Sequence, residues 1–158
     1  IRFDENDARA TGRVSMGVKG MNLADGDSVI GMQVAEENGE LLFVSEMGMG
    51  KKTAMSEFKD QNRGGKGIRC YRVNAKTGNL AGVKVYKEGY ELMLITTEGT
   101  VIRMKTDTIP VLGRDTSGVK LMQVDQENVK VSSIELIEES KEEEFAETSE
   151  ETVGSKEV

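Results

Sequence analysis

Positively charged side chains recur along this sequence of 158 residues at a nearly constant interval. Arg13, Arg63 and Arg114 are spaced by 50 and then 51 residues. Each is followed after four residues by a glycine and after six by a second base, and a third base precedes it by eleven. Cations that recur once per structural unit suit a polyanion running along an array, so the spacing predicts binding to phosphate groups. The recurrent bases are Arg2, Arg13, Lys19, Lys52, Arg63, Arg69, Arg103, Arg114 and Lys120.

The second repeat adds a glycine-rich heptapeptide at residues 61–67, with the sequence QNRGGKG. The pair Gly64-Gly65 lets backbone amides approach phosphate oxygens without hindrance from a Cβ atom, and Arg63 and Lys66 supply the opposite charge. Taken alone, such a heptapeptide is equally typical of a flexible, solvated loop. The recurrence of bases at fixed positions in three repeats favours the binding interpretation.

Other kinds of chemistry have little support in this sequence. It contains no histidine, which excludes histidine-based triads and metal sites. Its one cysteine, Cys70, allows no internal disulfide and lies in an alternating run that is typical of a buried thiol. Residues 48–53, GMGKKT, lack the first glycine and the Ser or Thr of a Walker loop, so they predict a hairpin turn. No stretch approaches the roughly 20 apolar residues of a membrane span and no signal peptide opens the chain, which favours the cytoplasm.

The formal net charge of -7 is unevenly distributed. Residues 135–158 carry ten glutamates and two lysines, whereas residues 41–91 sum to +5. A Glu-rich segment with few apolar residues cannot bury enough surface to offset its ordering entropy. We therefore expect a disordered acidic tail at residues 138–158 and a concentration of phosphate contacts in the second repeat.

Short apolar and β-branched runs predict the strands that position these cations. Two of the runs are followed by a glycine-containing turn and a second run, which is the pattern of a β-hairpin. Asn38-Gly39 is a further hairpin signal, and no helical period is sustained before residue 135. The expected strands are residues 41–45, 51–55, 80–86, 92–96, 100–105 and 129–136.

Three repeats of about 50 residues therefore divide the chain, each with about four short strands. The first, residues 1–40, is incomplete because no opening strand precedes Arg2. We expect this chain to be a piece of a longer protein whose array extends upstream. The second repeat covers residues 41–91 and the third residues 92–137, before the tail.

At these residues the chain resembles the C-terminal domain of the DNA gyrase A subunits. QNRGGKG is similar to the gyrase box of that family, usually Gln-Arg-Arg-Gly-Gly-Arg/Lys-Gly. The flanking stretches IRFDENDARATGRVSMGVKGMNL, LLFVSEMGMGKKT and LMLITTEGTVIRM are similar to its last three blades. The resemblance covers residues 1–136. It implies an all-β β-pinwheel, with propeller-like blades of about four antiparallel strands that bend DNA around a basic rim.

The resemblance also implies roles for the recurrent cations. Rim residues facing phosphates would be Arg13, Arg63, Lys66, Arg69, Arg114 and Lys120. Their hairpin neighbours would be Arg2, Lys51, Lys52 and Arg103, and Lys19, Gly64 and Gly65 complete the expected DNA-binding set. Asn62 stands where the box has its second arginine, so the box is degenerate, and the cleavage tyrosine of the family has no counterpart here.

The resemblance implies double-stranded DNA as partner. A second gyrase A protomer and the gyrase B protein would be contacted through other parts of the parent protein. ATP and magnesium would serve that holoenzyme and not this part, which is expected to be non-catalytic. Two alternatives stay open. One is the A-type subunit of topoisomerase IV, and the other is a propeller-like module for protein interaction. Trp-Asp repeats are excluded because the chain has no tryptophan, and the single Gly64-Gly65 pair makes kelch repeats a poor fit.

Overall fold

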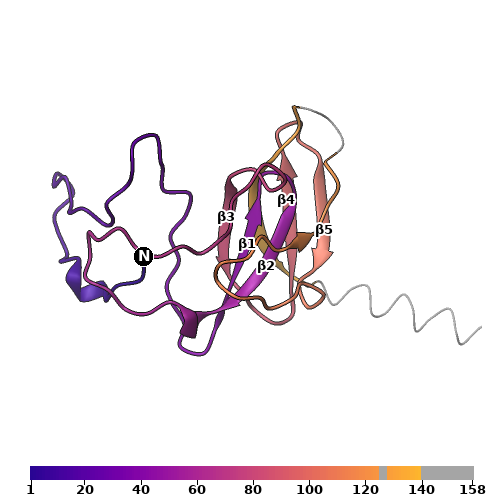
Figure 1. Ribbon diagram of the computed structural model, residues 1–158. Helices are drawn as coiled ribbons and strands as arrows, with labels where there is room; N and C mark the ends of the chain where they lie inside the picture. Colours follow the sequence, from indigo (N-terminus) through magenta and orange to yellow (C-terminus); the bar gives the residue numbers. More distant parts are fainter. Residues whose placement is uncertain (125–127, 140–158) are drawn as a thin grey trace, which may run out of the picture.

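The computed structural model describes residues 1–124 and 128–139. In this part the chain forms two antiparallel sheets that lie side by side (Figure 1), so the all-β, propeller-like expectation is confirmed. The first sheet has the strand order β3-β1-β2-β6 and the second the order β5-β4-β7. The elements are η1 (Glu5–Asp7), β1 (Glu40–Ser45), β2 (Met49–Ala54), η2 (Met55–Glu57), β3 (Leu80–Val85), β4 (Tyr90–Thr96), β5 (Val101–Lys105), β6 (Val119–Lys120) and β7 (Val131–Glu138).

A hairpin contributes two adjacent strands to each sheet, as the glycine turns predicted. β1 pairs with β2 and β4 pairs with β5, both antiparallel. Gly48 closes the first turn with a φ of 76°, and Gly99 closes the second with a φ of 82°. A Cβ atom at Gly48 would lie 2.7 Å from the carbonyl oxygen of Met122, so both backbone angle and packing require glycine there.

A distant segment completes each hairpin. β3 returns to pair with β1, and β7 returns to pair with β4, which it follows over seven residue pairs. The fourth strand of the first sheet, β6, comes from the third repeat: Met49 pairs with Lys120 and Gly50 with Val119. Gly118 has a φ of 74° and no room for a Cβ atom against the carbonyl oxygen of Gly50. The third repeat therefore contributes a strand to the sheet of the second, which the sequence pattern did not show.

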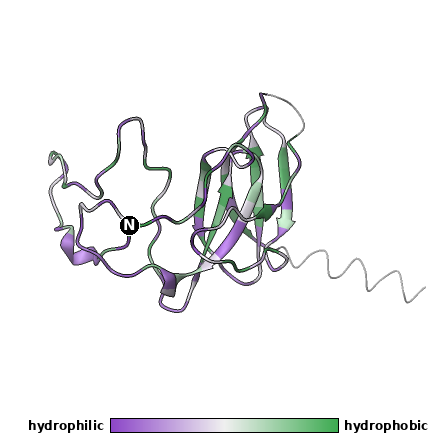
Figure 2. Cartoon of the chain, viewed as in Figure 1, coloured by the Kyte–Doolittle hydropathy of each residue, from purple (hydrophilic) through white to green (hydrophobic). Residues whose placement is uncertain are grey.

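The core joins the two sheets. Leu42 and Val44 of β1 and Leu92 and Leu94 of β4 are all fully buried in one apolar cluster, and Ile134 of β7 is 6% exposed. The strands of this cluster are the apolar (green) arrows of Figure 2, whereas β2 is hydrophilic. Burial of these side chains is the main stabilising contribution to the two sheets.

Residues 1–39 contain no strand and form an extended loop beside the sheets (Figure 1). One backbone bridge pairs Arg2 with Asp60 in parallel, and its counterpart one repeat later pairs Lys52 with Val111. Asn38 makes the expected turn with a φ of 62°. No strand precedes it, so the expectation of a hairpin at Asn38-Gly39 was wrong.

The expected boundaries between repeats, at residues 40/41 and 91/92, stay predictions. The sheets do not mark them, because β6 lies in the third repeat of the sequence and pairs in the sheet of the second. The expected acidic tail lies outside the described residues, except for Glu138 and Glu139. No helix in the described part is long and apolar enough to cross a membrane.

Candidate nucleic-acid interface

The in-register arginines connect consecutive repeats. Arg63 donates from Nε to the carbonyl oxygen of Asp7 at 2.8 Å and from Nη1 to that of Lys19 at 2.6 Å. Arg114 donates in the same way from Nη1 to the carbonyl oxygen of Arg69 at 2.7 Å. Half-buried guanidinium groups thus act at equivalent positions as links between main chains.

Each of these arginines stands in a loop that docks on the preceding repeat. We call the contacts of residues 63–65 with residues 7–22 the first junction, and those of residues 114–117 with residues 69–74 the second junction. In the first, the amide of Asn22 donates to the carbonyl of Gly65 at 2.8 Å. In the second, the amide of Arg72 donates to the carbonyl of Thr116 at 3.0 Å.

Backbone geometry also repeats at the junctions. The glycine that follows each arginine by four residues, Gly17, Gly67 and Gly118, has a φ of 76°, 75° and 74° respectively. These glycines turn the chain just before the base that follows two residues later. Lys19 and Arg69 thus hold equivalent places, and Lys120, at the same spacing in the sequence, lies in β6.

Five of the expected DNA-binding cations are exposed. No hydrogen bond or ion pair within the described residues engages the side chains of Arg13, Lys66 or Lys120. Lys19 donates from Nζ to Oδ1 of Asn22 at 3.0 Å, and Arg69 is 66% exposed. Arg69 lies 3.5 Å from a carboxylate oxygen of Asp115, but the other four side chains are free to meet an anion. The amide of Gly64 is not, because it donates to the carbonyl of Gly20 at 2.8 Å.

Lys51 and Lys52 lie inside the protein, against expectation. Lys51 is completely buried, and its Nζ donates to the carbonyl oxygens of Gly113 at 2.8 Å and Arg114 at 2.7 Å. Desolvation lowers the pKa of this lysine, although its attraction to Cys70 and nearby carboxylates opposes the shift. Neither lysine belongs to an accessible surface.

Lys52 is 6% exposed and is paired on two sides. Its Nζ lies 3.6 Å from Oε2 of Glu40 and 3.9 Å from the centroid of the Tyr86 ring. A cation held between a carboxylate and an aromatic face is desolvated and already compensated. A DNA phosphate cannot reach it without opening the sheet.

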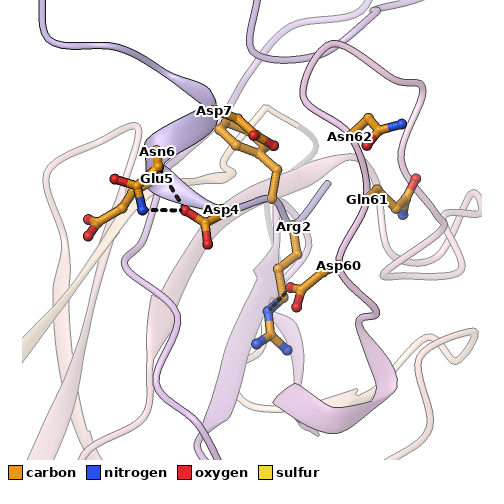
Figure 3. A pocket seen from close by; sticks show the side chains of 9 residues that line it. Arg2, Asp4, Glu5, Asn6, Asp7, Asp60, Gln61 and Asn62 are labelled. Atoms are coloured by element: carbon orange, nitrogen blue, oxygen red, sulfur yellow. Dashed lines mark hydrogen bonds and ion pairs between the residues drawn. The ribbon is translucent and has the colours of Figure 1, made fainter.

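Arg2 and Arg103 are exposed in part but have acidic partners. Arg2 lies 2.8 Å from Asp60 and donates to the carbonyl oxygen of Phe58 at 3.1 Å. Figure 3 shows it beside a hollow that is rich in carboxylates, a setting that repels an anion. Arg103 forms an ion pair with Glu91 on the neighbouring strand.

Two residues that sequence reasoning left out of the interface are Arg72 and Asp115. Arg72 is 61% exposed, and its Nε lies 3.5 Å from Oδ1 of Asp115. Recurrence could not find Arg72, because the equivalent positions hold Asn22 and Gln123. The one available signal for Arg72 was its closeness in sequence to the heptapeptide at residues 61–67.

Metal-binding and thiol chemistry have little support in the described part of the chain. No group of three or more potential metal ligands occurs there. Cys70 is half-buried, and its desolvation raises the pKa of the thiol, which suits an inert core residue. The exposed cations are the chemistry that this surface offers.

Comparison with known proteins agrees with this architecture. The family of DNA gyrase C-terminal domains, described as a beta-propeller, matches residues 1–36, 39–87 and 90–138. The chain is 44% identical over 135 residues to the DNA gyrase A subunit of Ureaplasma parvum serovar 3, covering 85% of this chain and 16% of the relative. It is 38% identical over 131 residues to that of Pseudomonas aeruginosa, covering 83% and 14%.

Solved structures give the same result. The structure of a DNA gyrase A C-terminal domain superimposes with a TM-score of 0.78 at 29% identity, over 85% of this chain and 46% of the other. The C-terminal domain of a DNA topoisomerase IV gives a TM-score of 0.79 at 26% identity, over 96% and 47%.

The fold and its repeated exposed cations define a propeller-like module in which a strand of one repeat completes the sheet of the preceding one. The chain belongs to the DNA gyrase C-terminal domain family. It spans about one sixth of the length of the curated relatives that it matches.

Proposed function

We propose that this chain binds double-stranded DNA through its phosphate backbone, along the row of exposed cations at the two junctions. The observation that supports this most is the repetition of the junctions, in which Lys19 and Arg69 hold equivalent positions; Lys120 recurs at the same spacing in the sequence. Evenly repeated cations fit a regularly charged polymer, and Lys66 and Arg13 are further exposed cations. Such contacts tolerate any sequence, since phosphates are read for position and shape.

A salt titration of DNA binding tests the proposal. With about four phosphate contacts, the logarithm of the affinity should fall against that of the salt concentration with a slope of roughly -3 to -4. The triple variant Lys66→Ala, Arg69→Ala, Lys120→Ala should flatten this slope by about 2 or more and weaken all sequences alike. A matched variant with the same charge change, Lys87→Ala, Lys105→Ala, Lys130→Ala, lies outside the junction loops and should change the slope much less. Equal slopes for both triple variants would contradict the assignment.

For the parent protein we propose DNA wrapping that contributes to ATP-dependent negative supercoiling. In this view the gyrase B protein supplies the ATP and magnesium chemistry, a second gyrase A protomer completes the cytoplasmic holoenzyme, and this part remains non-catalytic. Family membership and the exposed cation row support the proposal. Introducing the triple variant into the parent protein should reduce supercoiling and leave ATP-independent strand cleavage intact.

A second candidate is the A-type subunit of topoisomerase IV. The structural similarity to the C-terminal domain of a topoisomerase IV favours it, as does Asn62 in the heptapeptide. The two candidates differ in product. A parent protein that introduces negative supercoils into relaxed plasmid is a gyrase, and one that only relaxes and decatenates is not.

A further inference from the structure

The two junctions have the same main-chain design and can be compared position by position. Arg63 and Arg114 each reach the carbonyl of a basic residue in the preceding repeat, as shown above. The spacing of 51 residues aligns Gly64 of the first junction with Asp115 of the second. A carboxylate therefore stands in one junction where the other has no side chain at all.

Asp115 faces the cations of the second junction. Its Oδ2 lies 3.5 Å from Nη1 of Arg69, and its Oδ1 lies 3.5 Å from Nε of Arg72. In the first junction the base equivalent to Arg69 is Lys19, and the only partner of its side chain among the described residues is the neutral side chain of Asn22. The second junction thus holds a carboxylate between two of its cations, and the first has no carboxylate at the equivalent position.

The loop around Asp115 is fixed on both sides. Thr116 donates from Oγ1 to the carbonyl of Gly113 at 2.8 Å, and its own carbonyl receives the amide of Arg72. Ser117 donates from Oγ to the carbonyl of Arg72 at 2.9 Å. The carboxylate is therefore held between the two guanidinium groups by its backbone and not by a flexible loop.

A carboxylate between two arginines occupies the place that a phosphate would take. The side chains of Asp115, Arg69 and Arg72 are 43%, 66% and 61% exposed, so their ion pairs are screened by water. Exposed pairs of this kind contribute little to stability, and a phosphate can replace them. Partial desolvation raises the pKa of Asp115, but Arg72 and Arg69 together outweigh it and lower the pKa, so the carboxylate is charged at neutral pH.

We propose that Asp115 is a specificity-determining residue that occupies Arg69 and Arg72 in the free protein and directs phosphate binding to the first junction. A DNA phosphate reaches these two arginines only when it displaces the carboxylate. The second junction then engages DNA less strongly than its cation count alone predicts. The inference rests on the proposed function, because it assigns a role within DNA binding.

The test compares DNA affinity and its salt dependence among variants of the full chain. Asp115→Asn should bind a mixed-sequence duplex about two- to tenfold more tightly at low salt, since two exposed pairs no longer compete. Its slope against salt should steepen by about 1 to 2 as the freed arginines take up phosphate contacts. Glu98→Gln removes the same charge from an exposed hairpin turn and should change affinity only slightly.

The reciprocal exchange makes the prediction independent of any effect on folding at position 115. Gly64→Asp introduces the carboxylate into the first junction and should weaken DNA binding relative to Gly64→Asn. Both variants place a side chain on the same left-handed backbone, so the strain cancels and the charge remains.

The outcomes separate this inference from the proposed function. If wild-type binding depends on salt while Asp115→Asn behaves like Glu98→Gln, the role of Asp115 is refuted and DNA binding stands. If Gly64→Asp and Gly64→Asn bind equally, the role is likewise refuted. Should no variant bind DNA in a salt-dependent manner, both the proposed function and the inference fail.

Discussion

The first 36 residues and the two sheets carry the same sequence pattern but differ in burial. A spacing of 51 residues aligns Met32 with Val83 and Ile134, and Val34 with Val85. Met32 and Val34 are 88% and 83% exposed, whereas Val85 and Ile134 are each 6% exposed. An apolar alternating run therefore becomes a buried strand only where a hairpin is present to pair with it. The local pattern is necessary for these strands and does not suffice.

The first repeat nevertheless keeps the contacts that stack one repeat on the next. A Cβ atom at Gly31 would lie 2.9 Å from Cγ1 of Val83, and one at Gly82 would lie 2.6 Å from Cγ1 of Ile134. The same glycine-to-branched packing thus occurs twice, one repeat apart. Residues near Gly31 hold their place through this packing even though they form no strand.

Hydrogen exchange should show the largest contrast between the two regions. Amides of β1 and β4, which are central in their sheets, open only with global unfolding. Amides of residues 14–34 have few internal acceptors and should exchange faster by a factor on the order of a thousand or more. Mass spectrometry of peptides from both regions measures this. Uniform protection across residues 1–138 would contradict the comparison.

The second largest effect is expected on stability when the buried Lys51 is replaced, because this lysine joins the second repeat to the third. Lys51→Met removes the donor to two carbonyl oxygens and should lower the free energy of unfolding by about 2 to 4 kcal/mol. Lys66→Met is the control: this exposed side chain should leave stability unchanged and weaken DNA binding. Urea denaturation of both variants separates the structural lysine from the surface one, and equal stabilities would refute the distinction.

Matched valines test the burial difference directly. Val85→Ala removes two methyl groups from a packed strand and should cost about 2 kcal/mol. Val34→Ala, at the equivalent place in the first repeat, should change stability by less than about 0.5 kcal/mol. The same denaturation experiment measures both. A comparable loss in the two variants would mean that Val34 is buried in solution.

The sequence predicted the hairpins because the information for them is local. Runs of apolar residues around Gly48 and Gly99 specify both the strands and the turns that join them. β6 could not be predicted in this way, since Val119–Lys120 is only two residues long and its pairing depends on the docked loop around Gly118. The position of β6 depends on how the third repeat packs on the second, and a short stretch of sequence does not contain that information.

Two causes can produce the recurrence of cations, a structural contact and a binding site, and the sequence alone cannot distinguish them. Recurrence of Arg63 and Arg114 reports a repeated structural contact as much as a ligand site, and both guanidinium groups bind carbonyls. Lys51 was expected to bind DNA because the family resemblance implied it, but no alternation of buried and exposed residues holds in β2, where residues 50–53 are all buried. Its carbonyl partners lie about 60 residues away in sequence. The exposed bases stay predicted DNA contacts.

The smallest expected effect concerns pH and one position of the repeat. A spacing of 51 residues aligns Gln33, Lys84 and Glu135, and Lys84 donates to both carboxylate oxygens of Glu135 at 2.8 and 2.9 Å. This hydrogen bond to Lys84, only partly offset by desolvation, lowers the pKa of Glu135 below its usual 4.5. Because the folded pKa is depressed, the stabilisation is present above pH 4.5 and is lost as the pH falls through the folded pKa.

Exposure of this pair limits its contribution to less than about 1 kcal/mol. Lys84→Met should therefore be slightly less stable than the wild type at neutral pH, with the difference shrinking once Glu135 is protonated. Gln33→Met, at the equivalent position of the first repeat, has no titrating partner and should show a difference that does not depend on pH in this range. Denaturation curves at neutral and acidic pH measure both. If the Lys84→Met difference stays constant as Glu135 titrates, the ion pair does not link the two sheets in solution, and the apolar core that includes Ile134 holds them together.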